Sequence, residues 1–487
     1  MLYKKITSFT GKKYIYLTSQ NKFIQVNDVI YDIFEDLISL KKEDFIARYE
    51  SKYDVLQLSN YYDTFLTVEA RKDSKITPVN FNYSWDVKEL KAFLSTKLLS
   101  VTLGLTEKCN FKCRYCLDLD KFSNNKKHSL KRMSFSVAKA SIDYLLNNSA
   151  DQKLPRVVAF YGGEPLLGWN LIKKILDLYG NQNNTLHYVI STNGSLLNKE
   201  IIDYFIKYSV TLIVSLDGPQ NINDYNRIFK NSSESTFKSV FNKLNFIKKI
   251  SKEYFENFVS CNSVVGYDVD IDFLKLKNFF DNNKLRCNIS AVVRRFEDQQ
   301  LFKPVNQYGY QEIKEQYYNS FINDCVRSRF VNDFFEISLR PLHNRNINKI
   351  SDGAYRKTCI PGLEKLFVDS NGDFYTCEKL KNFESMQIGN FREGINIKRV
   401  YSLLNRYKKF QEKDCYDCWL IRLCNLCFYQ FISNKKTFDI NKKHENCKII
   451  KRHFEDILPL YVSILEWNIN ALDFLKKESS EVGIFNK

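Results

Sequence analysis

Short apolar runs alternate with amphipathic stretches from about residue 97 onward. The apolar runs cover residues 98–105, 156–161, 186–190, 211–214, 258–265 and 287–293. Between them, apolar residues recur at helical spacing, for example over residues 136–146 and 198–207. Repeated βα units predict a parallel sheet with right-handed crossovers. We therefore expect an α/β fold built as a partial (β/α)6 barrel of the TIM type, open on one side.

The first 95 residues have a different pattern. β-prone runs at residues 14–17 and 23–26 flank a polar turn and predict a hairpin. Asn27 can cap a helix over residues 30–38, and a second helical stretch covers residues 43–52. This small α+β module resembles the winged-helix-like leader-recognition domains at the front of many peptide-modifying enzymes. A purely structural N-terminal cap is the alternative.

Three cysteines lie in the loop after the first strand of the βα region. They are Cys109, Cys113 and Cys116, spaced C-x3-C-x2-C. Thiolates are the usual protein ligands of iron–sulfur clusters, and three of them leave one iron of a [4Fe–4S] cluster open. A zinc site, which prefers C-x2-C pairs and four ligands, is the alternative, together with chance clustering. The spacing, with Tyr115 before the last cysteine, resembles the signature of the radical SAM (S-adenosylmethionine) superfamily.

The turns that follow the next strands agree with this resemblance. It implies that S-adenosylmethionine is held by Tyr115, Gly162, Gly163, Glu164, Ser191, Asn193, Ser215 and Arg227. Within this set, the glycines would let the backbone approach closely, and Glu164 would accept hydrogen bonds from the ammonium group. Ser191 and Asn193 would contact the ribose or nearby polar atoms. Ser215 and the Arg227 fork would hold the carboxylate, and Tyr115 would pack near the adenine.

A second group of cysteines lies toward the C-terminus: Cys359, Cys377, Cys415, Cys418, Cys424, Cys427 and Cys447. Their order resembles the SPASM extension of peptide-modifying radical SAM enzymes, with one departure. Only two residues separate Cys424 from Cys427, where the family has three. The resemblance assigns Cys415, Cys418, Cys424 and Cys447 to one auxiliary [4Fe–4S] cluster, and Cys359, Cys377 and Cys427 to another. Three clusters would then be present in all, and a pair of zinc ions is the alternative at the second group.

The auxiliary cluster assigned to Cys359, Cys377 and Cys427 lacks a fourth cysteine. Cys325, a non-cysteine side chain or a thiolate of the substrate could complete it. Glu378 directly follows Cys377, which makes it a candidate general base. An ordinary surface glutamate is the alternative.

The motifs divide the chain into five expected parts. These are a leader-recognition-like module (1–95), the partial barrel (96–300), a bridging helical segment (301–355), the auxiliary-cluster domain (356–450) and a C-terminal helix (451–487). The bridging segment carries no motif and predicts one helix over residues 308–330. The isolated Cys261, Cys287 and Cys325 are expected to be buried structural thiols.

The charge of the chain is strongly positive, at +17 over 487 residues, but its lysines are scattered in pairs and form no run of five or more basic residues. Neither nucleic acid nor a membrane is therefore expected as a partner, although an acidic peptide leader would suit this surface. The N-terminus lacks the apolar core of a signal peptide. We expect a cytoplasmic protein, in which thirteen cysteines favour metal binding over disulfides.

These resemblances together imply a radical SAM/SPASM maturase that installs a thioether or another side-chain crosslink in a ribosomally synthesised precursor peptide. An external one-electron reductant of the flavodoxin or ferredoxin type would supply an electron to the cluster at Cys109, Cys113 and Cys116. A 5′-deoxyadenosyl radical would then take a hydrogen atom from the peptide. The cofactor would supply this radical chemistry, and the protein would orient the reactants. Crosslinking removes two electrons from the substrate, and the auxiliary clusters are a plausible acceptor for the second.

Two alternatives remain at this stage. A sulfatase-maturing enzyme would oxidise cysteine or serine to formylglycine, but such relatives usually lack a front module of this size. A non-catalytic iron–sulfur electron-transfer or sensor protein would have no need for the turn at Gly162, Gly163 and Glu164, because it does not bind the amino group of S-adenosylmethionine.

Overall fold

The computed structural model describes residues 2–67, 87–116, 129–149, 155–181, 185–265, 270–291, 306–323, 328–345, 359–381, 383–433 and 437–476. Its centre is a sheet of parallel strands: β4 (Ser100–Thr106), β5 (Arg156–Gly162), β6 (Leu186–Thr192), β7 (Thr211–Ser215), β8 (Val259–Val265) and β10 (Cys287–Ala291). They lie in the order β10-β8-β7-β6-β5-β4, each parallel to its neighbour. The predicted α/β class with a central parallel sheet is confirmed, while closure into a partial barrel stays a prediction.

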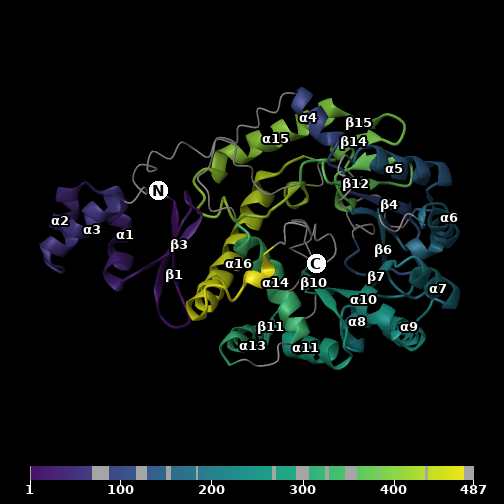
Figure 1. Cartoon of the computed structure of the whole chain (residues 1–487), viewed down its shortest axis with the longest axis horizontal. Helices are drawn as coiled ribbons and strands as arrows, with labels where there is room; N and C mark the ends of the chain where they lie inside the picture. Colours follow the sequence, from purple (N-terminus) through teal and green to yellow (C-terminus); the bar gives the residue numbers. More distant parts are fainter. Residues whose placement is uncertain are drawn as a thin grey trace.

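Amphipathic helices connect these strands. They are α5 (Phe135–Asn147), α6 (Trp169–Tyr179), α7 (Lys199–Lys207), α8 (Gln220–Asn226), α9 (Thr236–Ile250), α10 (Lys252–Phe258) and α11 (Phe273–Asn282). Local sequence sets their starts: Ser134 and Asn198 cap α5 and α7 by accepting main-chain N–H bonds. Figure 1 shows α5, α6, α7 and α9 in a row outside the strands. The sheet is thereby covered, and its strand ends are left to form a rim.

The sheet continues past β4 into the C-terminal region. β12 (Lys365–Val368) pairs in parallel with β4, and β13 (Asp373–Tyr375), β14 (Gln387–Asn390) and β15 (Gly394–Ile395) follow in antiparallel order. The sequence predicted none of these strands. As a result, the cysteine-rich region shares one sheet with the βα region, and the expected boundary near residue 356 does not separate two sheets.

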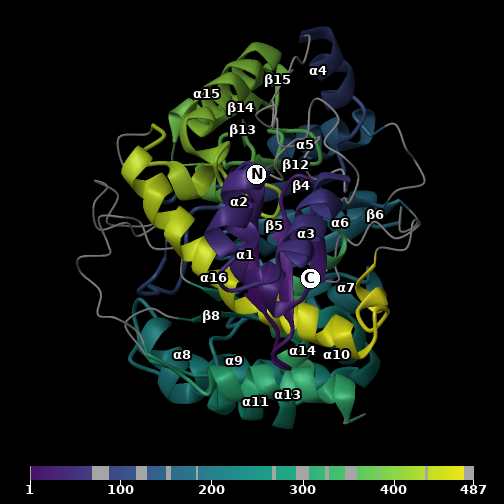
Figure 2. The ribbon, with the colours of Figure 1, turned by 90° about the vertical axis from the view of Figure 1, so that its left-hand side faces the viewer.

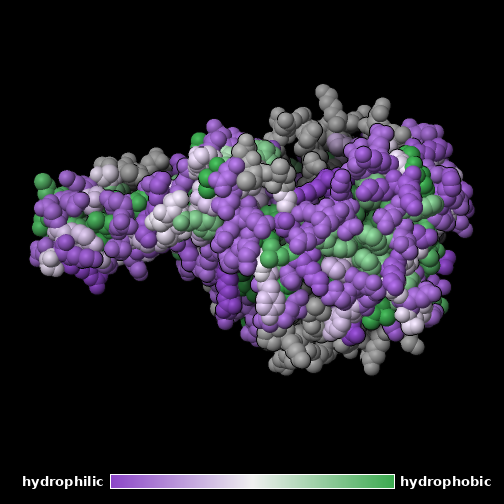
Figure 3. Space-filling view, turned by 90° about the horizontal axis from the view of Figure 1, so that it is seen from below, coloured by the Kyte–Doolittle hydropathy of each residue, from purple (hydrophilic) through white to green (hydrophobic). Residues whose placement is uncertain are grey.

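The N-terminal module pairs β1 (Tyr3–Thr7), β2 (Lys13–Leu17) and β3 (Lys22–Val26) as an antiparallel sheet. Its helices are α1 (Asp28–Ser39), α2 (Lys42–Tyr49) and α3 (Val55–Thr67). The predicted hairpin and the cap at Asn27 are confirmed, since Asn27 accepts the Ile30 N–H at 2.8 Å. Strand β1 and helix α3 were not predicted. Seen from below, the module is a narrow lobe on one side of the molecule (Figure 3).

Alternation along β2 divides the module between two cores. Ile15 and Leu17 pack with the helices α1–α3, whereas Tyr16, between them, belongs to the large core of the sheet. Long helix α16 (Ile440–Trp467) runs between the module and the βα region (Figures 1 and 2). The N–H of Phe9 donates to the Ser463 hydroxyl at 2.8 Å. The module is therefore joined to the rest of the chain by its sheet and by α16.

Two helix predictions need correction. The single helix expected over residues 308–330 is wrong: α13 (Tyr310–Ile322) starts after Gly309, and α14 (Arg329–His343) starts after its own cap, Ser328. The C-terminal helix begins at Ile440, not at residue 451, because the Asp439 carboxylate caps it. Helix α15 (Ile397–Cys415) completes this region. None of the described helices combines the length and apolar composition that crossing a bilayer requires.

The remaining described elements are short. They are α4 (Val87–Leu94), β9 (Ile271–Asp272), β11 (Gln307–Tyr308) and the 3-10 helices η2 (Pro165–Gly168), η3 (Glu378–Leu380), η4 (Glu384–Met386), η5 (Phe428–Phe431) and η6 (Asp473–Leu475).

Candidate functional site

The loop at residues 107–116, here called the first cysteine loop, is held by a segment far away in the sequence. The N–H of Lys112 donates to the Ile228 carbonyl at 2.8 Å. The rings of Phe111 and Phe229 meet edge to face, with centroids 4.7 Å apart. These contacts fix residues 226–230 against the loop and bring Arg227 beside the cysteines. No local pattern in the sequence signals this pairing.

The two glycines after β5 also contact the first cysteine loop. Gly162 has φ +150, and a Cβ atom there would lie 2.4 Å from the Thr106 carbonyl oxygen. At Gly163, a Cβ atom would lie 2.2 Å from the Lys108 carbonyl oxygen. The N–H of Gly163 donates to the Thr106 carbonyl at 2.7 Å. Close backbone approach was predicted here, and the structure shows that the loop backbone is what approaches.

Glu164 is fully buried and accepts three hydrogen bonds. Its Oε1 accepts from the Leu166 N–H at 3.0 Å and from the Thr192 hydroxyl at 2.5 Å, and its Oε2 accepts from the Asn193 N–H at 2.7 Å. Burial raises the pKa of Glu164, and these donors oppose the rise. The carboxylate thus ties the turn after β5 to the turn after β6. Its contact with an ammonium group stays a prediction.

The turn after β6 reaches the first cysteine loop through an amide pair. Asn193 donates from Nδ2 to the Asn110 Oδ1 at 2.8 Å, and Asn110 donates to the Ser195 hydroxyl at 2.9 Å. Asn193 therefore connects the rim to the loop, a role that the sequence did not predict. Ser191 and Ser215 lie at the ends of β6 and β7 and are partly exposed. Their contacts with S-adenosylmethionine stay predictions.

Tyr115, Asp217 and Arg227 form a polar triad, in which Asp217 and Arg227 are buried and Tyr115 is partly exposed. The Tyr115 hydroxyl donates to the Asp217 carboxylate at 2.8 Å, and the Arg227 Nη1 donates to the Tyr115 hydroxyl oxygen at 2.7 Å. Asp217 also accepts the Val264 N–H from β8 at 3.2 Å. Sequence analysis placed Tyr115 and Arg227 at different parts of the cofactor and missed Asp217. A single Asp-Gly turn gives no signal for a buried carboxylate.

Electrostatics couple this triad to the cysteines. Burial raises the pKa of Asp217 to about 6, and the Arg227 guanidinium opposes the rise. Burial likewise raises the pKa of Cys113, which Arg227 lowers. The pKa of Cys109 is raised by burial to about 12, opposed first by the Phe111 N–H, which donates to its sulfur at 3.3 Å. A fixed cation and an N–H donor thus oppose, without overcoming, the rise in pKa that burial causes at these thiols.

A comparison with family models matches residues 103–280 to the radical SAM superfamily. The match starts in β4, contains the first cysteine loop and the rim turns just described, and ends in α11. This stretch, which is less than half of the chain, is similar to the radical SAM superfamily. Such a domain implies S-adenosylmethionine and one [4Fe–4S] cluster, and it agrees with the sequence resemblance.

Individual relatives extend beyond this domain. The radical SAM cyclopropyl synthase TigE of Paramaledivibacter caminithermalis is 24% identical over 68% of this chain and 68% of its own length. The cysteine-type anaerobic sulfatase-maturating enzyme of Clostridium novyi is 23% identical over 55% of this chain and 70% of its own. A solved structure of native anSMEcpe with bound AdoMet and Kp18Cys peptide has a TM-score of 0.54 at 18% identity, covering 76% of this chain and 99% of that one. The last likeness shows the fold alone.

The residues of the radical SAM domain fit the cluster that it implies. Three thiols come from one loop, and the buried Nε of Arg227 has no hydrogen-bond partner in the described part of the chain. A cation with a spare donor suits thiolates and an anionic cluster. In the same described part, no group of three His, Cys, Asp or Glu side chains is arranged to hold a metal ion. A [4Fe–4S] cluster differs from a single ion because each of its cysteines binds a different iron.

The C-terminal cysteines fall into two sets. Cys415, Cys418, Cys424 and Cys447 line one cavity of about 240 Å³, here called the auxiliary cavity. Helix α15 ends at Cys415, and α16 supplies Cys447. Lys443 borders the cavity and pairs with Asp414 at 3.1 Å. The four cysteines that the resemblance assigned to one cluster are therefore neighbours in space, and their ligand role stays a prediction.

The second set is Cys359, Cys377 and Cys427. Partial loss of hydration raises the pKa of Cys359, although the residue is exposed, and the nearby Cys427 raises it further. Burial also raises the pKa of Cys377, with further contributions from Glu378 and Cys427. Cys427 is thus a neighbour of the other two despite its unusual spacing. The Gln430 side chain fixes its backbone by accepting the Cys427 N–H at 2.8 Å.

Two further predictions concern this second set. Glu378 opens the short helix η3 beside Cys377 and is partly exposed, so a role as general base stays a prediction. Cys325, one candidate for the missing ligand, lies outside the described residues.

Cys261 and Cys287 are buried and are register partners on β8 and β10, as expected of structural thiols.

The N-terminal module contacts the segment that carries the auxiliary cysteines. The Thr18 hydroxyl donates to the Trp419 carbonyl at 2.8 Å, and Arg422 donates from Nη1 to the Ser19 carbonyl at 2.6 Å. Trp419 and Arg422 lie between Cys418 and Cys424 in the sequence. The hairpin turn between β2 and β3 is therefore bonded to the segment between Cys418 and Cys424, part of which lines the auxiliary cavity.

Proposed function

We propose that this chain is a radical SAM maturase that forms a thioether or another side-chain crosslink in a ribosomally made peptide, whose leader is held by the N-terminal module. The observation that carries the proposal is an apolar cavity of about 500 Å³ beside strand β3. Its lining comes from β2, β3, α1 and α3: Ile15, Leu17, Ile24, Gln25, Val26, Asn27, Ile30, Phe34, Leu37, Tyr61, Thr64 and Phe65.

Strand β3 borders this cavity and provides main-chain groups with which a bound peptide could pair. In the described part of the chain, β3 pairs with β2 alone and forms the edge of its sheet. An extended peptide can add to such an edge, with main-chain hydrogen bonds for affinity and alternate side chains in a pocket for specificity. A leader with apolar residues at alternate positions would fill the cavity, and acidic residues elsewhere in it would suit the net charge of +17.

The rim of the radical SAM domain supplies the reaction site. Cys109, Cys113 and Cys116 would hold the cluster, while Glu164 and Arg227 would orient S-adenosylmethionine. When bound, the cluster and S-adenosylmethionine together supply the one-electron cleavage that allows a hydrogen atom to be taken from the peptide. Arg227 would also balance the negative charge beside Cys113, and the buried Asp217 and Arg227 show that water is excluded from that side.

The auxiliary cysteines support an oxidative outcome. A crosslink removes two electrons from the substrate, and a cluster in the auxiliary cavity, with another at Cys359, Cys377 and Cys427, would accept the second. The first would leave with the hydrogen atom that the 5′-deoxyadenosyl radical takes, and an external flavodoxin- or ferredoxin-type protein would supply the separate electron that reduces the cluster at Cys109, Cys113 and Cys116. Glu378, next to Cys377, would take the proton that leaves the substrate.

A sulfatase-maturing activity is the second candidate, because one of the related chains is a cysteine-type anaerobic sulfatase-maturating enzyme. In addition, the anSMEcpe structure with a similar fold holds the Kp18Cys peptide. Both candidates need a peptide substrate, and they differ in the product. Formylglycine formation from cysteine removes the sulfur, whereas a thioether crosslink keeps it.

Mass spectrometry of the product separates the two candidates. Small peptides encoded beside the gene, and a sulfatase-derived cysteine peptide, would be incubated anaerobically with the cluster-loaded protein, S-adenosylmethionine and a reductant. Loss of two hydrogens from an encoded peptide, with 5′-deoxyadenosine release, is expected. Modification of the sulfatase peptide alone would replace the proposal by the second candidate, and no 5′-deoxyadenosine under any condition would overturn both.

The leader site has its own test. Ile24→Glu puts a charge into the apolar cavity beside β3 and is expected to weaken binding of a fluorescently labelled precursor peptide by at least tenfold. Leu56→Glu is the matched control, since Leu56 is 70% exposed on α3 and does not line the cavity. Equal affinities for both variants would remove the module from leader binding.

A further inference from the structure

A separate cavity of about 480 Å³ lies at the opposite end of the sheet from the rim. It opens where β8 begins at Val259 and where β10 is entered from Leu285 and Arg286. Two aromatic side chains, Phe255 and Phe280, are buried in its wall. The N-terminal ends of these strands are about 20 Å from their C-terminal ends, at about 3.3 Å per residue. The cavity is therefore outside the proposed reaction site.

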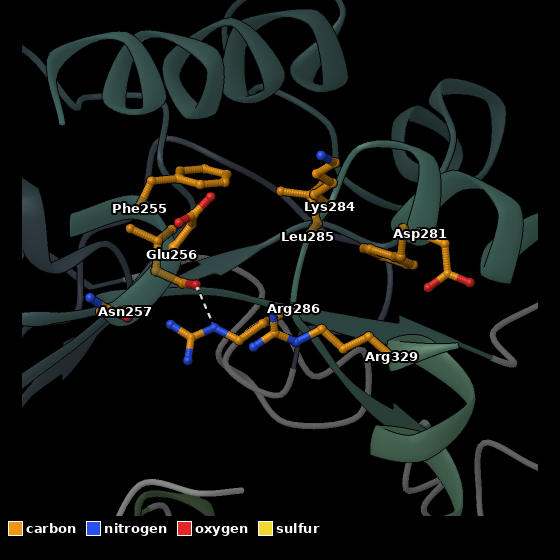
Figure 4. A pocket seen from close by; sticks show the side chains of 10 residues that line it. Phe255, Glu256, Asn257, Asp281, Lys284, Leu285, Arg286 and Arg329 are labelled. Carbon is orange, nitrogen blue, oxygen red and sulfur yellow. Dashed lines mark hydrogen bonds between the residues drawn. The ribbon is translucent and has the colours of Figure 1, made fainter. Parts of the chain in front are cut away.

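Two arginines dominate its charge. Figure 4 shows Arg329, from the start of α14, extending toward Arg286, from the start of β10, whose own side chain continues away from Arg329 toward the Asn257 side of the cavity. Burial lowers the pKa of Arg286, and the positive charge of Arg329 lowers it further. In the described residues, the hydrogen bond of the Arg286 side chain is the one from its Nε to the Val259 carbonyl, at 3.3 Å. Within the described part of the chain, neither guanidinium forms an ion pair.

The two carboxylates in the wall already have partners of their own. Glu256 lies 3.8 Å from Lys252, one turn away on α10. The Asp281 carboxylate accepts the Ser328 hydroxyl at 2.6 Å and lies 3.6 Å from Lys277. Negative charge in the wall is thus satisfied locally, whereas the positive charge faces the cavity.

Two further groups reinforce this asymmetry. Lys284, whose φ is +56, adds a third cation to the lining. Asp333 is the remaining nearby carboxylate; burial raises its pKa, and Arg329, the Cys287 N–H and Arg286 oppose the rise. Asp333 forms no ion pair with either guanidinium in the described residues. Arg329 is the first residue of α14, so the N-terminus of this helix, with its partial positive charge, also lies beside the cavity.

We propose that this cavity binds a small phosphate-bearing anion, gripped by Arg286 and Arg329. A planar guanidinium matches two phosphate oxygens, and two of them with Lys284 suit a dianion better than a single carboxylate. The apolar wall at Phe255 leaves room for an organic group on the phosphate. This binding goes beyond the proposed peptide modification and does not depend on it.

Calorimetric titration of the full-length, cluster-loaded protein tests the proposal. The probes are inorganic phosphate and phenyl phosphate, with sodium chloride at matched ionic strength as the blank. Saturable binding by the wild type is expected, together with at least tenfold weaker binding by Arg329→Gln. Arg329→Lys keeps the charge but loses the fork, so it should bind with intermediate affinity. Arg329 makes no hydrogen bond or ion pair in the described part, so these variants should fold, which a melting curve would check.

The control is Lys199→Gln, which removes an exposed cation on α7, far along the sequence from the cavity. Tighter binding of phenyl phosphate than of inorganic phosphate would identify an organic phosphate ester as the ligand, and equal binding would identify free phosphate. No saturable heat with either probe would overturn the proposal. So would unchanged affinity in Arg329→Gln, or an equal loss in Lys199→Gln.

Discussion

The first cysteine loop and the auxiliary cavity both gather cysteines, but their surroundings differ. Beside the first cysteine loop lie three charged side chains, Glu164, Asp217 and Arg227, that are at most 7% exposed. Around the auxiliary cavity, the lining includes one buried cation, Lys443, which pairs with the partly exposed Asp414. Helices and the N-terminal hairpin hold the rest of that cavity.

This difference agrees with a ligand-recognition site beside the first cysteine loop and a site at the auxiliary cavity that only holds a cluster. Burying charges costs free energy even when they are paired, so a protein gains little stability from keeping them. The charges beside the first cysteine loop are explained if they position a polar ligand such as S-adenosylmethionine. A site that only stores or relays electrons has no such need, and the auxiliary cavity lacks buried carboxylates among its described lining residues.

Gly163→Ala should have the largest effect and should affect the first cysteine loop alone. The new Cβ atom would lie 2.2 Å from the Lys108 carbonyl, and backbone cannot move aside as a side chain can. We expect a cost on the order of 3–5 kcal/mol for the local structure. Iron bound at Cys109, Cys113 and Cys116 should be lost while the auxiliary iron remains, as measured by iron analysis and Mössbauer spectroscopy.

Gly168→Ala is the control for this substitution. Its Cβ atom would meet only the Leu105 Cβ atom, at 3.7 Å, an ordinary contact. Iron content should be unchanged in this variant. Equal iron in Gly163→Ala and the wild type would show that the glycine is not needed for the loop.

Asp217→Asn tests the buried charge beside the first cysteine loop by its pH dependence. Burial raises the pKa of Asp217 from 3.8 to about 6, so the folded state favours the protonated acid. Its contribution to stability is therefore complete below pH 4 and is lost as the pH rises through 6. Relative to the wild type, Asp217→Asn should gain about 3 kcal/mol between these values, measured from urea midpoints at each pH.

Asp224→Asn should show the opposite trend. Burial would raise the pKa of Asp224, but hydrogen bonds from Ser235, the Phe237 N–H and Thr236 prevail and lower it. That carboxylate stabilises the fold above its unfolded pKa, and the stabilisation disappears as the pH falls. Parallel profiles for the two variants would contradict the buried-charge account.

The strand order and the cysteine groups could be predicted from the sequence because both are written as local patterns. Apolar runs separated by amphipathic helices gave six strands near their observed positions, and polar turns marked their ends. The family resemblance separated Cys415 and its partners from Cys359 and its partners, and the first set lines one cavity. Patterns of this kind depend on neighbouring residues, which the fold cannot easily override.

Contacts between distant segments could not be predicted in this way. Asp217 and Arg227 meet Tyr115 only because residues 226–230 pair with the first cysteine loop. Strand β12 joins β4 across more than 250 residues of sequence. Register and pairing partner are set by tertiary packing, and a four-residue strand carries too little periodicity to reveal them.

Arg422→Gln should have a moderate effect, confined to the auxiliary cavity. It removes the 2.6 Å bond to the Ser19 carbonyl that joins the N-terminal hairpin to the segment between Cys418 and Cys424. A charged donor lost from a buried carbonyl costs about 1.5–3 kcal/mol. The N-terminal module should become more sensitive to limited proteolysis, and auxiliary iron should be lost faster to a chelator. Iron at the first cysteine loop should not change; faster loss there would contradict the separation of the two regions.

Glu378→Gln should have the smallest effect on structure and still stop the proposed reaction. Glu378 is partly exposed on the short helix η3, so its replacement should change the free energy of unfolding by less than about 0.5 kcal/mol. Iron content should match the wild type because Glu378 is not one of the proposed ligands, and 5′-deoxyadenosine release should match because it depends on the first cysteine loop. A missing general base should lower product formation by about 10²–10⁴. Glu384→Gln, on the neighbouring helix η4, should leave all three quantities unchanged. If Glu378→Gln forms product at the wild-type rate, the proton leaves by another route and Glu378 is a surface residue.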